Sequence, residues 1–154
     1  MTSMLVSGRL GILGVTVLGL AACGGGTVTV VADSPVDSGF EDVFVSGQES
    51  TVGEVARSAG VDPGTWDRMY YFSVPILESE VNSVLGTSGT TWSGLPGAGA
   101  DGLVVFMSGS DVVYAAVADD VPLSLTGYAT AESKVGPEQQ IQDYHRVVVE
   151  SAGR

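Results

Sequence analysis

The 154-residue chain contains a single cysteine, Cys23, and a single histidine, His145. One cysteine cannot form a disulfide within the chain, so the fold must depend on an apolar core. Metal centres built from thiolates and imidazoles need several such ligands at set spacings. The sequence therefore predicts no metal-binding, cofactor-binding or catalytic residues of these kinds.

Basic side chains are also scarce, with six Lys and Arg residues against 18 Asp and Glu residues and a formal net charge of −12. A chain this acidic repels nucleic acid and anionic headgroups. We therefore expect no nucleic-acid partner.

Long hydrophobic runs are missing too. The segment from Leu10 to Ala22 is 13 residues long and is interrupted by glycine and threonine, whereas a bilayer-spanning helix needs ~20 apolar residues. It follows Arg9, and a basic residue before a short apolar segment is typical of a secretory signal. We predict a signal peptide over residues 1–22.

The apolar segment ends in Leu20-Ala21-Ala22-Cys23. This motif resembles the lipobox of bacterial lipoproteins, Leu-(Ala/Ser)-(Gly/Ala)-Cys, at all four positions. The resemblance implies that diacylglycerol is attached to the Cys23 thiol, with fatty acids such as palmitate, and that the preceding peptide is removed. Two acyl chains suffice for stable anchoring, so the expected location is the cell envelope, on the extracytoplasmic side of a membrane.

Without the signal, the 132 residues from Cys23 onward carry five basic side chains and a net charge of −13. This length suits one modest domain plus a tether. Glycine, serine, proline and aspartate are enriched after Cys23, which predicts a flexible tether over residues 23–39 and a single domain over 40–154. Alternation in Thr27–Val31 leaves an edge strand possible there.

Sequence periodicity and turn residues predict several elements within the domain. Thr51 and Glu54 have capping-box spacing at the start of a helix that ends at Gly60. The other expected elements are a strand over 66–74, a helix over 76–85, a possible strand at 90–92, a β-hairpin over 103–117 and a last strand over 144–150. Residues 119–143 show no clear pattern. The expected fold class is α+β, with two short helices packed on a small antiparallel sheet of three to five strands.

The segment 66–118 resembles a module of small bacterial lipoproteins of uncharacterised function. The shared features are Trp66-Asp67-Arg68, a strand reaching Phe72, Pro75, a helix ending Leu85-Gly86, and an apolar hairpin. Ile76 stands where that family often has tyrosine. The resemblance implies a fold and no chemistry. A looser likeness to two-helix lipoproteins, including outer-membrane assembly factors and enzyme-inhibitor domains, rests on the helix end and the hairpin alone.

Residues 51–69 are similar to the N-terminal helix-turn-helix of lactose-repressor-type regulators. Such a motif needs a cationic face for phosphate contacts, but this window has two arginines against three acids. It also follows an export signal. Capping and turn chemistry explain the pattern without DNA.

Candidate catalytic groups are few. The carboxylate pairs Glu41/Asp42, Glu78/Glu80 and Asp119/Asp120 are typical of solvated faces, with a weak calcium site at Asp119/Asp120 as the alternative. His145 is the obvious general base, but no Gly-x-Ser-x-Gly motif accompanies it.

We therefore expect a non-enzymatic binding or interaction module without a cofactor. Its partners would be the membrane, through the lipid, and an unknown protein or small ligand, contacted through the glycine-rich loop around Trp92 and exposed strand edges. The alternatives are an envelope hydrolase that uses His145 and an inhibitor of an envelope or secreted enzyme.

Overall fold

The computed structural model describes residues 25–139 and 145–154. This part of the chain contains three α-helices and one 3-10 helix: α1 (Pro35–Ser46), α2 (Val52–Ser58), η1 (Pro63–Thr65) and α3 (Glu78–Leu85). Its strands are β1 (Thr27–Thr29), β2 (Ser50–Thr51), β3 (Arg68–Ser73), β4 (Thr91–Ser93), β5 (Gly102–Ser108), β6 (Asp111–Ala118), β7 (Leu123–Ser124), β8 (Tyr128–Ala129), β9 (Lys134–Gln139) and β10 (His145–Val149).

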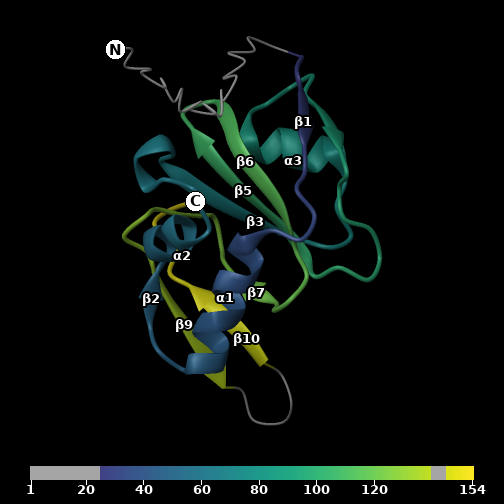
Figure 1. Cartoon of the computed structure of the whole chain (residues 1–154). Coiled ribbons are helices and arrows are strands. Elements are labelled where there is room, and N and C mark those ends of the chain that lie inside the picture. The colour runs from purple at the N-terminus through teal and green to yellow at the C-terminus, as the bar shows by residue number, and fades with distance from the viewer. Residues whose placement is uncertain (1–24, 140–144) are drawn as a thin grey trace, which may run out of the picture.

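The central sheet has the strand order β6-β5-β3-β8 and is antiparallel throughout (Figure 1). Strand β5 lies between β3 and β6, and its residues Gly102 to Met107 are all buried. Successive side chains of a strand point to opposite faces, so β5 supplies apolar groups to both sides of the sheet. Two separate cores form on these two faces.

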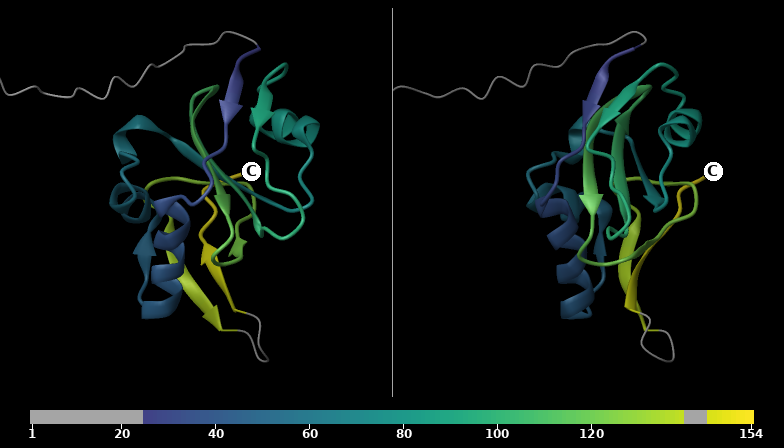
Figure 2. Two further views of the ribbon diagram at one scale, coloured as in Figure 1. Left: turned by 45° about the vertical axis from the view of Figure 1, so that its right-hand side comes forward. Right: turned by 90° about the vertical axis from the view of Figure 1, so that its right-hand side faces the viewer.

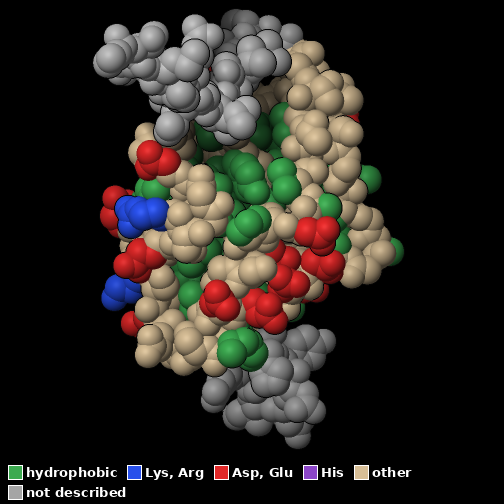
Figure 3. Space-filling view, in the orientation of Figure 1, with side chains coloured by type: hydrophobic (Ala, Val, Ile, Leu, Met, Phe, Trp, Pro, Cys, Tyr) green, Lys and Arg blue, Asp and Glu red, His purple; other side chains and the backbone are tan. Residues whose placement is uncertain are grey.

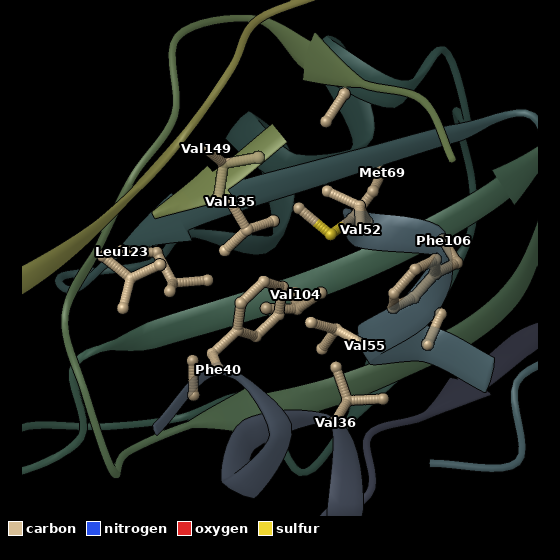
Figure 4. Close-up of a cluster of buried hydrophobic side chains, with 14 of the residues drawn as sticks. Val36, Phe40, Val52, Val55, Met69, Val104, Phe106, Leu123, Val135 and Val149 are labelled. Atoms are coloured by element: carbon tan, nitrogen blue, oxygen red, sulfur yellow. The ribbon is translucent and has the colours of Figure 1, made fainter. Parts of the chain in front are cut away.

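The first core lies between the central sheet and a layer formed by α1, α2 and a second sheet of order β2-β9-β10-β7. Figure 4 shows Phe40 of α1 close to Val104 of β5, with Val135 and Val149 of the second sheet above them. The buried members of this core are Val36, Phe40, Val43, Val52, Val55, Ala56, Val61, Trp66, Met69, Val104, Phe106, Ala118, Val121, Leu123, Ala129, Val135, Val147 and Val149.

The second core lies on the opposite face of the central sheet, under α3 and the two-stranded parallel sheet of β1 and β4. In Figure 2, β1 and β4 run side by side at the end of the molecule far from α1. Val31 continues β1 and forms a parallel bridge to Ala116 of β6, which connects this small sheet to the central one. The buried members are Val30, Tyr70, Val81, Leu85, Trp92, Leu103, Val105, Met107 and Ala115.

The α+β class is confirmed, with mostly antiparallel strands. The capping box is present in α2, because the Glu54 amide donates to Thr51 Oγ1 and the Thr51 amide donates to Glu54 Oε2. The hairpin corresponds to β5 and β6, which pair from Gly102 to Ala118. The described residues contain a third helix and more strands than we expected.

The tether expected over residues 23–39 is wrong from residue 25 onward. Ser34 caps α1 through a hydrogen bond from the Val36 amide to its Oγ, and Pro35 occupies the first turn. Val36 and Phe40 of this helix are fully buried in the first core. Their spacing, continued by Val43, is the helical signal that the polar composition of the segment obscured.

Candidate functional site

The lipobox residues Leu20, Ala21, Ala22 and Cys23 lie outside the described residues. The described chain begins two positions after Cys23, where Gly25 lies against the loop Gly86–Thr90: a Cβ built on Gly25 would be 3.8 Å from the Gly89 carbonyl oxygen. The Thr91 amide then donates to the Gly26 carbonyl at 3.0 Å. The folded domain therefore starts almost immediately after the predicted lipidation site.

A hydrogen-bond network holds this end of the domain together. Asn82 Oδ1 accepts from Trp92 Nε1 at 2.8 Å and from Thr87 Oγ1 at 2.9 Å, and its Nδ2 donates to the Thr90 carbonyl at 2.7 Å. Glu78 Oε2 accepts from the Trp92 amide at 3.0 Å. One asparagine thus joins α3, the Gly86–Thr90 loop and β4. The indole of Trp92 is buried, so it is not an exposed contact of the glycine-rich loop.

A groove of about 350 Å³ opens between α1, α2 and the start of β2. Gly39, Val43 and Val55 line it together with the carboxylates of Asp42, Glu49 and Glu54. Glu54 is already engaged in the capping box and accepts from Ser50 Oγ at 3.0 Å, whereas Asp42 and Glu49 are exposed. Such a lining favours a ligand with a cationic group and an apolar stem.

A second polar feature surrounds Asp37 of α1, whose side chain is only 7% exposed. Its Oδ2 accepts from the Asp119 and Asp120 amides at 2.8 and 2.9 Å, while Oδ1 has no hydrogen-bond partner among the described residues. Burial raises the pKa of the Asp37 carboxyl, and the charges of Asp120 and Asp119 raise it further, against the lowering effect of the two amides. Sequence reasoning missed Asp37 because it placed this residue in the tether.

Two further groups near this feature have shifted pKa values. Burial raises the pKa of the Asp101 carboxyl, and the charge of Asp119 adds to that effect. Burial likewise raises the pKa of the Tyr71 hydroxyl. Tyr71 also lines a pocket of about 220 Å³ with Ser73, Ile76 and Glu80. Burial thus favours the neutral form of both groups.

The predicted carboxylate pairs take different positions. Asp119 and Asp120 use their amides to bind Asp37, Glu78 binds the Trp92 amide, and Asp42 lies in the groove. No group of three or more His, Cys, Asp or Glu residues within the described ranges could hold a metal ion. The backbone of His145 lies at the start of β10, opposite Gln139, and its side chain is outside the described part.

Comparison with known proteins gives no relative for this chain: no family model matches it, and neither a curated protein nor a solved structure does. Within residues 25–139 and 145–154, no helix has both the length and the apolar character needed to cross a membrane.

Proposed function

We propose that the protein is a lipid-anchored, extracytoplasmic binding module, attached to the membrane through Cys23. The observation that carries this proposal is the sequence Leu20-Ala21-Ala22-Cys23, which leads within a few residues into a folded domain at β1. Diacylation supplies the two membrane signals that stable anchoring requires. The rest of the chain then serves to present a binding surface at the membrane.

Replacing Cys23 tests the anchor directly, because the chain has no other thiol. Cys23→Ala should abolish incorporation of labelled palmitate and prevent formation of a mature amino terminus at residue 23, as read by mass spectrometry. Ser38→Ala, an exposed position on α1, serves as the control and should retain both. Palmitate incorporation that persists in Cys23→Ala would refute the anchor.

The groove between α1 and α2 supports the binding part of the proposal. It combines an apolar floor, to which Val43 and Val55 contribute, with the exposed carboxylates of Asp42 and Glu49. A lysine or arginine side chain matches both features, since its stem is apolar and its head is cationic. We therefore propose that the groove binds a cationic segment of a protein or peptide.

Charge reversal at matched positions separates groove binding from general attraction to an acidic protein. In nonionic detergent, the lipidated protein is titrated with a trilysine peptide at several salt concentrations. Asp42→Lys/Glu49→Lys should lower the affinity at least tenfold more than Asp111→Lys/Glu132→Lys, which changes the net charge equally at positions outside the groove. Equal losses in the two double variants would contradict a specific groove.

A further inference from the structure

The start of the domain is tied closely to the predicted lipid. Gly25 follows Cys23 by two residues, and each step between neighbouring Cα atoms spans about 3.8 Å, so their Cα atoms are at most about 7.6 Å apart. Gly25 itself lies against Gly89. If Cys23 is lipidated, the Gly86–Thr90 loop therefore lies close to the membrane whatever the path of the intervening residue.

This end of the molecule is uncharged in an otherwise acidic chain. No residue from Gly24 to Ala32 or from Val81 to Ala100 carries a charge. The two segments are far apart in sequence but pair through β1 and β4, which combines them into one surface. Its outward side chains include Thr27, Thr29, Ser88 and Thr91, all exposed hydroxyls that suit a layer of polar headgroups.

The acidic side chains lie elsewhere. Figure 3 shows them over α1, over the chain near β7 and along the left edge of the molecule on the side of α2, whereas the visible area over β1 has no acidic side chain. Glu78 and Glu80 lie in the first turn of α3, and this helix reaches the Gly86–Thr90 loop with its other end. The Glu78 carboxylate is the charge that comes close to β4, where it accepts a hydrogen bond from the Trp92 amide. An anionic membrane surface would repel the acidic side and tolerate the uncharged one.

From these observations we infer that the start of β1 and the Gly86–Thr90 loop form a membrane-facing surface that rests in the lipid headgroup layer. This inference depends on the lipid anchor proposed above. The headgroup layer is about 5–8 Å thick on each side of the bilayer, which is comparable to the reach from Cys23 to Gly25. Helix α1 runs away from this end, so the groove and Gln48 at its far end face the aqueous phase (Figures 1 and 2).

Single labelling sites can measure this orientation, because a lipidated Cys23 is a thioether and does not react with thiol reagents. Ser88→Cys and Gln48→Cys place one reactive thiol at each end, both at exposed positions. The lipidated proteins carry an environment-sensitive fluorophore at that thiol and are inserted into vesicles of phosphatidylethanolamine and phosphatidylglycerol. Quenching is then compared between headgroup spin-labelled lipid and iodide in the aqueous phase.

We expect the Ser88 label to be quenched by the spin-labelled lipid at least threefold more than the Gln48 label, and iodide to give the opposite order. Equal accessibility to iodide would overturn the orientation. Protection of Ser88 from iodide without quenching by lipid would also overturn it, in favour of a protein contact. Palmitate labelling of the same two variants shows whether the anchor is intact, so its loss would instead refute the proposed function.

A charged substitution gives an independent test. Thr27→Glu, introduced into both labelled proteins, adds an acid to the proposed membrane surface at an exposed position of β1. It should reverse the quenching order in vesicles rich in phosphatidylglycerol while leaving palmitate incorporation unchanged. Ser46→Glu, exposed at the far end of α1, is the matched control and should leave the order as it is without a charged substitution. An unchanged order with Thr27→Glu would contradict contact with the headgroup layer.

Discussion

Trp66 and Trp92 are buried to the same degree, each 6% exposed, on opposite faces of the central sheet. They differ in what their indole N–H groups contact. Trp92 Nε1 donates to Asn82 Oδ1, whereas Trp66 Nε1 has no partner among the described residues. Trp66 is held instead by its ring, which meets Phe106 edge-on at 4.8 Å between centroids.

The difference between the two tryptophans reflects how each core is assembled. The first core draws on two helices and two sheets and contains twice as many buried residues as the second. Dense apolar packing there fixes Trp66 without a hydrogen bond. The second core is covered by a short helix and two three-residue strands, so the Asn82 network supplies the positional restraint that packing alone provides on the other side.

The largest expected effect comes from placing a charge inside the central strand β5, which supplies side chains to both cores. Val105 lies in the middle of β5 and is fully buried, so Val105→Asp should lower the free energy of unfolding by several kcal/mol. Val113→Asp, on the partly exposed edge strand β6, is the control and should cost much less. Urea unfolding followed by circular dichroism measures both, and equal losses would show that β5 is not the shared centre.

A smaller effect distinguishes the two tryptophans themselves. Trp66→Phe and Trp92→Phe remove the same volume, but only the second breaks a hydrogen bond. A buried hydrogen bond contributes about 1 kcal/mol net, and removing an unpartnered N–H relieves a desolvation cost. Trp92→Phe should therefore destabilise the protein by at least about 1 kcal/mol more than Trp66→Phe, as measured by chemical denaturation. Equal destabilisation would mean that the Asn82 network does not restrain the second core.

The same contrast explains what the sequence predicted and what it did not. Helix α2 and the β5–β6 hairpin have strong local signals, a capping box in one and two apolar runs around a glycine turn in the other. Strand β9 has little such signal, because its pairing with β2 and β10 is set by tertiary contacts. Asn82 is one polar residue in a short helix, and its three partners converge only after β4 and the Gly86–Thr90 loop have folded around it.

Neither composition nor spacing predicted that Asp37 would be buried. A substitution there gives the smallest expected effect on stability, and that effect has the sharpest pH dependence. The pKa of Asp37 in the folded protein is raised, chiefly by burial and then by the charges of Asp120 and Asp119, so folding favours the protonated carboxyl. The stability that Asp37 contributes is therefore complete below about pH 4, its value in the unfolded chain, and is lost as pH rises through the raised pKa.

Asp37→Asn removes this titration while keeping an amide oxygen that can accept from the Asp119 and Asp120 amides. Relative to wild type, the variant should gain stability, on the order of 1 kcal/mol, as pH rises from 4 to 7, since only the wild type must ionise a carboxyl whose Oδ1 has no partner in the described chain. Asp101, whose pKa is also raised, is present in both proteins, so its contribution largely cancels in the difference between the two stability curves. Tyr71, whose pKa is raised above its ordinary value near 10, stays neutral in both proteins over this pH range. Thermal unfolding in matched buffers across this range provides that difference. A constant offset between the two proteins would show that Asp37 is solvated well enough to ionise at its ordinary pKa, and the packing of α1 against the end of β6 would then be looser than its hydrogen bonds indicate.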